Sequence, residues 1–249
     1  MRITEMHVTP IALGDPPLLN AAGLHAPYAL RTIVELVADN GLTGISEIPG
    51  STAITARLEQ AHAAVIGADP FNWNTLRQAV ADQFPEDKSD TRGDAPWDKR
   101  QLVQVFSALD VACLDLIGKA VNQPVANLLG GIVRDRVPFA AYLFYKHEGA
   151  GGELAFGTDP KATGWAAARQ KAALDPAGLV AQAQAMVREF GFKSIKLKGG
   201  VFAPAEEVAA IRALHEAFGP SVPLRLDPNA LWTAETAIKY GRELEPFLE

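Results

Sequence analysis

Within residues 193–200, polar and apolar side chains alternate from Ser194 to Lys198, a pattern that predicts a β-strand. Because the side chains of a strand point alternately to its two faces, Ile195 and Leu197 share an apolar face, and Lys196 and Lys198 share the opposite one. Two ammonium groups are therefore directed at one place. Neighbouring positive charge and partial burial both favour the neutral form of a lysine, which allows it to act as a base near neutral pH. The alternative interpretation is a solvated edge strand whose lysines lie in water.

The surrounding sequence repeats the order strand, helix, strand. Strands are predicted over residues 142–146, 193–200 and 224–227, and helices over 179–190, 205–218 and from about 234, with Asp175-Pro176 and Thr233 as helix starts and Gly191 and Gly219-Pro220 as stops. Repeated βα units imply a parallel sheet, and a (β/α) barrel builds its active site at the C-terminal ends of its strands. Lys198, Asp227 and Asn229 all stand at such ends.

The first half of the chain is organised differently. Strands are predicted over residues 2–13, 32–38 and 42–48, and helices over 53–66, 74–84 and 99–121; residues 85–98 are a predicted loop, and 148–173 a surface excursion over the barrel mouth. The pair Asn40-Gly41 is a strong hairpin signal. An antiparallel sheet followed by helices forms an α+β module. We therefore predict an α+β domain at residues 1–133 and the first part of a (β/α) barrel at residues 134–249.

Composition and charge exclude several classes of function. The chain is 48% apolar and 21% charged, and its formal net charge of −6 comes with no basic run that could follow a phosphate backbone. We therefore expect no nucleic-acid partner. The apolar windows are too short to span a bilayer, and the N-terminus lacks the apolar core of a signal peptide, so we expect no membrane partner and a cytoplasmic location. The single cysteine, Cys113, lies in an apolar helical stretch and is predicted to be a core residue.

Seven segments together resemble the enolase superfamily, in its mandelate racemase-like branch, and most closely the acid-sugar dehydratases of the glucarate dehydratase type. They are Ile3-Thr4-Glu5-Met6, residues 19–27, residues 44–50, residues 112–116, Ala141-Tyr142-Leu143-Phe144, residues 195–200 and Leu226-Asp227-Pro228-Asn229. Any one of these motifs alone is a weak signal. The resemblance covers nearly the whole chain and implies an N-terminal capping domain followed by a TIM-type barrel.

The resemblance also implies a reaction and roles for particular residues. A proton alpha to a carboxylate is weakly acidic, because its removal places a second negative charge on that carboxylate. Sites of this superfamily combine a Lys or His base with Mg²⁺. Lys198 is then the base, Lys196 adds positive charge beside the substrate carboxylate, and Asp227 offers a hard oxygen ligand to Mg²⁺. Loss of the beta hydroxyl gives a keto-deoxy sugar acid.

The substrate implied by the resemblance is a small sugar diacid. The residues expected to contact it are Asn20, His25, Tyr142, Lys196 and Asn229. His25 has the alternative interpretation of a surface histidine in a hairpin connection, and Tyr142 that of a core aromatic. The hydroxyl-bearing substrate contact of the family falls at Gln101 or Leu102, so the particular sugar acid stays open.

Length limits how much of the barrel is present. An eight-unit barrel needs about 250 residues, whereas residues 135–249 accommodate about three of the eight βα units. The family's further metal ligands and its His-Asp dyad are absent from this sequence. Three hypotheses follow: a fragment of an acid-sugar dehydratase, a non-catalytic truncated remnant, or another branch member such as a racemase, a cycloisomerase or a different sugar-acid dehydratase. We expect the 249-residue chain alone to be inactive, and the complete protein to be a homo-oligomer.

Overall fold

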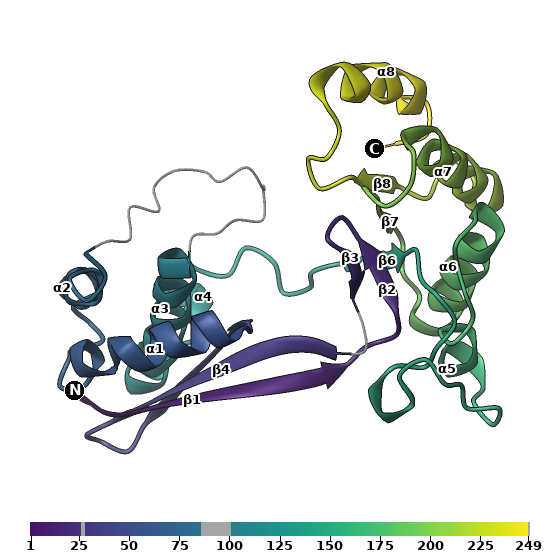
Figure 1. Ribbon diagram of the computed structural model, residues 1–249. Coiled ribbons are helices and arrows are strands. Elements are labelled where there is room, and N and C mark those ends of the chain that lie inside the picture. The colour runs from purple at the N-terminus through teal and green to yellow at the C-terminus, as the bar shows by residue number, and fades with distance from the viewer. Residues whose placement is uncertain (26–27, 86–100, 249) are drawn as a thin grey trace. The chain divides into compact units, whose positions relative to one another are not determined.

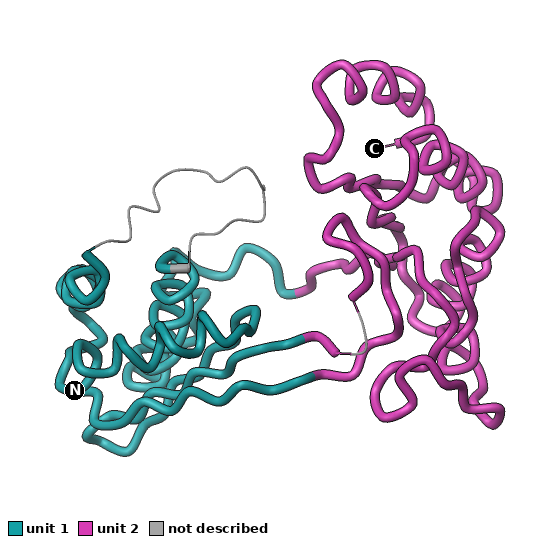
Figure 2. The backbone as a smooth tube through the Cα atoms, viewed as in Figure 1, with its two compact units in different colours: residues 1–12, 30–135 teal, residues 13–29, 136–249 magenta. Residues whose placement is uncertain are grey.

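The computed structural model describes residues 1–25, 28–85 and 101–248 and contains two compact units. Residues 1–12 and 30–135 form the first unit, and residues 13–29 and 136–249 form the second (Figure 2). Except for Pro85, the predicted loop at 85–98 lies outside the described residues. The predicted domain boundary at residue 133 stays a prediction, and the segment 13–29 belongs to the second compact unit.

The first unit combines an antiparallel sheet with helices (Figure 1). Its strands are β1 (Ile3–Gly14), β4 (Tyr28–Ala38) and β5 (Thr43–Pro49), in the order β1-β4-β5, and its helices are α1 (Thr52–Val65), α2 (Trp73–Ala81), α3 (Gln101–Ala120) and α4 (Val125–Leu128). The predicted hairpin is confirmed: β4 and β5 pair antiparallel around Asn40-Gly41, where Gly41 has a φ of 79°. Alternating apolar residues of β4 and β5 pack under α3, which places the core between the sheet and the helices.

Cys113 lies in this core and is 1% exposed, which confirms its predicted structural position. Burial, followed by the negative charge of Asp110, raises the pKa of the Cys113 thiol to about 12. The thiolate, which is the reactive form of cysteine, is therefore suppressed at neutral pH.

The second unit is built on a parallel sheet in the order β6-β7-β8. Its strands are β6 (Ala141–Phe144), β7 (Ile195–Lys198) and β8 (Leu224–Asp227), and they alternate with the helices α6 (Pro176–Phe190), α7 (Pro204–Phe218) and α8 (Ala234–Leu244). The predicted helix ends are confirmed, since Asp175 Oδ1 accepts a hydrogen bond from the Gly178 N–H, Thr233 Oγ1 accepts one from the Thr236 N–H, and Gly191 ends α6 in the left-handed conformation. This is an N-terminal antiparallel capping domain followed by part of a (β/α) barrel, as predicted.

The two faces of the parallel sheet have opposite chemistry. Ala141, Leu143, Ile195, Leu197 and Leu224 are buried in the core of this unit, together with apolar residues of α6 and α7. The alternate positions carry the lysines, and the register places Tyr142 beside Lys196 and Phe144 beside Lys198, with Asp227 next to Lys198 on the other side. The strand sequences thus bury one face in the core, and the opposite face carries the lysines and Asp227.

A small hairpin and a long excursion border the C-terminal end of β6. The hairpin consists of β2 (Leu18–Asn20) and β3 (Gly23–His25), and its Leu19 N–H donates to the Tyr145 carbonyl. The predicted excursion at 148–173 contains a short 3-10 helix, Gly152–Leu154, and the helix α5 (Gly164–Ala168). In the described parts of the chain, no helix is both long enough and apolar enough to cross a membrane.

Candidate active site

Lys196, Lys198 and Asp227 converge at the C-terminal end of the parallel sheet. Asp227 Oδ2 lies 2.9 Å from Lys196 Nζ and 3.2 Å from Lys198 Nζ, so one carboxylate oxygen is shared by two ammonium groups. The two lysines differ in burial, because the Lys198 side chain is 13% exposed and that of Lys196 is 32% exposed. The structure therefore brings together the two lysines and the acidic residue that the strand pattern singled out.

Asn229 joins this group through a tight turn after β8. Its backbone N–H donates to Asp227 Oδ1 at 3.1 Å, and its side-chain oxygen accepts a hydrogen bond from Lys198 Nζ. Asn229 has a φ of 52°, in the left-handed region that asparagine tolerates better than most residues. The Asp-Pro-Asn sequence thus directs both an acid and an amide oxygen at Lys198.

The electrostatics follow from these contacts. Desolvation raises the pKa of the Asp227 carboxyl, but hydrogen bonds from Lys196, the Asn229 N–H and Lys198 outweigh it, and the net pKa lies below its ordinary value. The hydrogen bond to Asp227 raises the pKa of Lys196, against the opposing effect of burial. At neutral pH the cluster thus contains an ionised carboxylate and a protonated Lys196.

Tyr142 supports the lysine face from the neighbouring strand. Lys196 Nζ lies 4.8 Å from the centroid of the Tyr142 ring, within range for a cation–π interaction. The Tyr142 ring also contacts Phe144, with ring centroids 4.5 Å apart. Tyr142 is 38% exposed, so it lies at the surface of this face rather than in the core.

The structure does not bring Asn20 and His25 into contact with the lysines. The Asn20 side-chain oxygen accepts a hydrogen bond from the Ala22 N–H at 2.8 Å, within its own turn. His25 Nδ1 lies 3.9 Å from Asp15 Oδ2. Both residues belong to the same compact unit as the lysines, and their predicted contact with substrate stays a proposal.

Sequence reasoning missed Lys146, which is 4% exposed. Its Nζ donates to the carbonyls of His147 and Lys171, each at 2.7 Å. Lys146 follows Tyr142 and Phe144 at the same two-residue spacing, and this spacing is the one signal in the sequence that places it on the lysine-bearing face. Its burial depends on how the excursion folds back, which no local pattern reveals.

The oxygen atoms around Lys198 fit part of a magnesium site. Asp227 contributes a carboxylate and Asn229 an amide oxygen. Mg²⁺ prefers such hard oxygens, and in proteins it is commonly held by one or two carboxylates while keeping several waters. Within residues 1–25, 28–85 and 101–248, no group of three or more His, Cys, Asp or Glu side chains is arranged to hold a metal ion. These residues therefore supply one carboxylate of such a site.

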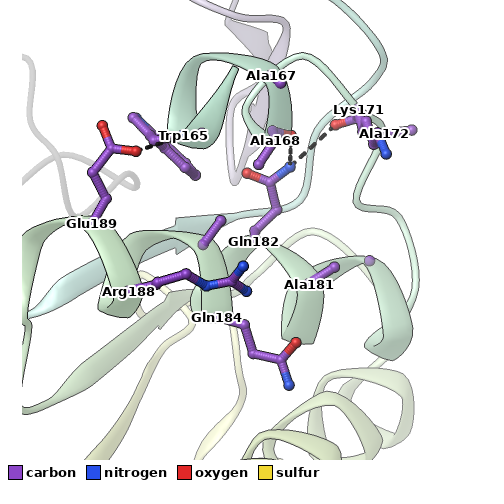
Figure 3. Close-up of a pocket in the computed structure, with 13 residues that line it drawn as sticks. Trp165, Ala167, Ala168, Lys171, Ala172, Ala181, Gln182, Gln184, Arg188 and Glu189 are labelled. Carbon is purple, nitrogen blue, oxygen red and sulfur yellow. Dashed lines mark hydrogen bonds between the residues drawn. The ribbon is translucent and has the colours of Figure 1, made fainter. Parts of the chain in front are cut away.

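A larger pocket of about 640 Å³ lies between α5 and α6 (Figure 3). Two of its polar side chains are engaged with the backbone: Gln182 donates to the Ala168 carbonyl at 2.5 Å, and Glu189 accepts from the Trp165 N–H at 2.6 Å. The lysine cluster, which consists of Lys196, Lys198, Asp227 and Asn229, contributes no residue to the lining of this pocket. Volume alone therefore does not mark it as the active site.

Two families match the chain. The family described as mandelate racemase/muconate lactonizing enzyme, N-terminal domain, matches residues 25–130, and the one described as enolase C-terminal domain-like matches residues 178–249. The probable glucarate dehydratase of Streptomyces coelicolor is 44% identical over 258 residues, which cover 100% of this chain and 57% of the relative. The chain therefore belongs to the enolase superfamily, in the mandelate racemase-like branch, and is related to glucarate dehydratase and other acid-sugar dehydratases.

Solved structures agree with this assignment. An enolase from Thermobispora bispora, complexed with magnesium and formate, has 48% sequence identity and a TM-score of 0.84. An enolase from Pseudomonas fluorescens with bound magnesium, potassium and tartrate has 41% identity and a TM-score of 0.82. Each covers the whole of this chain, and this chain spans 57% of the length of each.

Proposed function

We propose that this chain carries part of the active site of an acid-sugar dehydratase of the glucarate type. The reaction is abstraction of the proton alpha to a carboxylate, followed by loss of the beta hydroxyl to give a keto-deoxy sugar acid. The observation that carries the proposal is the pair of lysines on one strand face sharing the Asp227 carboxylate. The 44% identity to a probable glucarate dehydratase over the whole chain supports the substrate class.

Lys198 is the proposed base. Its side chain is the less exposed of the two lysines, and its Nζ is held by two oxygen atoms, Asp227 Oδ2 and Asn229 Oδ1. A base must be held within hydrogen-bonding reach of the proton that it removes. Fixed partners restrict the lysine rotamers, so this site positions Nζ before substrate binds.

Lys196 is the proposed partner of the substrate carboxylate. Its pKa is raised by Asp227, so it remains a cation at neutral pH and can stabilise the negative charge that develops on that carboxylate. The Tyr142 ring beneath Nζ holds the ammonium group from one side. Asp227, with Asn229 beside it, would hold Mg²⁺, which when bound supplies Lewis-acid stabilisation of the enediolate.

Other members of the branch remain alternatives. A racemase or a cycloisomerase uses the same Lys-x-Lys strand and first metal ligand, so these residues define proton abstraction rather than the fate of the product. A non-catalytic remnant is the further alternative. We favour dehydration because the relative with 44% identity over the whole chain is a probable glucarate dehydratase.

The test is alpha-proton exchange of D-glucarate in D₂O, with Mg²⁺, by the protein that carries these residues. Lys198→Ala should abolish exchange from the lysine face while leaving Mg²⁺ affinity nearly unchanged. Asp227→Ala should reduce Mg²⁺ affinity and turnover together, because a ligand is needed for both. Lys193→Ala is the matched control, since Lys193 is exposed and lies just before the same strand. Exchange at the unmodified rate in Lys198→Ala would refute the base assignment.

A further inference from the structure

A second, smaller cavity of about 280 Å³ lies beside Tyr142 in the second unit. Its walls include three aromatic side chains and three charged ones: Tyr142, Phe144, Trp165, Asp15, Lys146 and Arg169. A water molecule occupies about 30 Å³ of liquid volume, so the cavity has room for several waters or for one end of a small organic acid. Aromatic walls and a few charged groups are the usual features of a small-molecule site.

The cations of this cavity are incompletely paired. Lys146 Nζ has three N–H donors, and in the described parts of the chain two of them have acceptors, the His147 and Lys171 carbonyls. Arg169 is half-buried, and among the described residues no acceptor lies within hydrogen-bonding distance of its guanidinium group. Burial, followed by the positive charge of Arg169, lowers the pKa of Lys146 to about 8, against an opposing effect of Glu148.

The negative charge at the cavity wall does not offset both cations. Asp15 is the acidic residue among the lining side chains, and its carboxylate lies 3.9 Å from His25 Nδ1. Two neighbouring cations in a partly dry site are costly unless an anion is bound between them. A carboxylate satisfies both, because it accepts hydrogen bonds from a guanidinium group in a bidentate manner and from an ammonium group.

The cavity adjoins the lysine cluster through one residue. Tyr142 lines the cavity, and the same ring lies 4.8 Å from Lys196 Nζ. We propose that Lys146 and Arg169 bind the second carboxylate of a diacid whose first carboxylate lies at Lys196, and that they distinguish a sugar diacid from a sugar monoacid. This inference rests on the proposed function, and it assigns to Lys146 and Arg169 the recognition of the remote end of the substrate.

D-glucarate and D-gluconate are the matched probes, because they differ in the group at one end, a carboxylate in the first and a hydroxymethyl group in the second. Calorimetric titration of the 249-residue chain should show tighter binding of D-glucarate. Arg169→Gln should weaken D-glucarate binding about tenfold or more, since a hydrogen bond to a charged group is removed, and should leave D-gluconate affinity unchanged. Arg188→Gln is the control, because Arg188 lines the other pocket (Figure 3).

Several results would overturn the inference. These are equal affinity for the two acids, absence of binding of either, an unchanged preference for D-glucarate in Arg169→Gln, or displacement of both acids by inorganic phosphate, which would indicate a general anion site. Lys146→Gln tests the buried partner where circular dichroism shows that the variant folds. A failure of the proposed function gives a different result from a failure of this inference. If only the proposed function is wrong, neither Mg²⁺ nor Asp227→Asn alters acid binding, but Arg169→Gln still weakens the binding of D-glucarate.

Discussion

Replacing Asp227 by asparagine should destabilise the second unit by about 2 kcal/mol at neutral pH. The change keeps the shape of the side chain but removes the negative charge shared by Lys196 and Lys198. An ion pair near the surface contributes about 0.2–1 kcal/mol, which suits the one-third exposed Lys196. A hydrogen bond between a charged pair that is less exposed contributes about 1.5–3 kcal/mol, which suits Lys198. The lower ends of these ranges sum to about 2 kcal/mol.

The dependence of this difference on pH follows from two pKa shifts. The pKa of Asp227 is lowered, so its contribution to stability is complete above the unfolded value of about 4 and is lost as pH falls through the folded value. The pKa of Lys196 is raised, so its contribution is complete below about pH 10.4 and is lost as pH rises through the folded value. The difference between the two proteins should therefore be largest from about pH 5 to 9 and shrink on both sides.

Urea unfolding from pH 3 to 11, with amide hydrogen exchange of β7 to localise the change, measures this difference. Glu243→Gln is the control, because Glu243 forms an exposed ion pair with Arg212 at 3.0 Å. Loss of that pair should cost less than about 1 kcal/mol at any pH. A difference for Asp227→Asn no larger than that of the control, or one independent of pH, would refute the shared-carboxylate reasoning.

Two further predictions concern packing. Gly199→Ala should destabilise the protein by about 1–3 kcal/mol, because its Cβ would lie 2.6 Å from Glu207 Oε2 and 2.9 Å from Leu226 Cδ1. Gly241→Ala is the control, because its Cβ would have no neighbour within 4 Å, and it should stabilise α8 slightly. Thermal melts measure both changes, and equal shifts in melting temperature would contradict these contacts. Cys113 is 1% exposed and its thiol pKa is raised to about 12, so it should resist thiol reagents in the native protein and react fully in denaturant. A rapid reaction of the native protein would show that this core opens.

Local signals sufficed for most of the second unit. The two-residue alternation of 195–198 predicted which lysines share a face, and the parallel register then aligned Lys198 with Asp227. The Asp-Pro-Asn turn was recognisable because Asn229 occupies a conformation that suits asparagine. These features depend on neighbours in sequence or on regular pairing, so sequence reasoning reached them.

Other features depend on how distant segments fold together. A lysine is normally exposed, so no sequence rule indicates that Lys146 is buried by the Ala173 backbone pairing. Arg169 lines the cavity because the excursion at 148–173 forms α5 and returns toward β6. The short helix α4 was not predicted, because four residues carry little periodicity. Contact of Asn20 and His25 with the substrate depends on how the β2–β3 hairpin is placed over the strand ends, and this contact stays a prediction.

The position of Lys198 also depends on a helix that follows it in sequence. The Glu207 carboxylate of α7 is fully buried, and its Oε1 accepts hydrogen bonds from the Val201 and Phe202 N–H groups, at 2.8 and 3.2 Å. These groups belong to the loop that leaves the end of β7, and Gly199 lacks the Cβ that would press on the same carboxylate. These two donors satisfy one oxygen of the buried carboxyl group, whereas Glu207 Oε2 has no hydrogen-bond partner among the described residues. Helix α7 therefore fixes the loop that follows Lys198, and Asp227 fixes the Lys198 side chain.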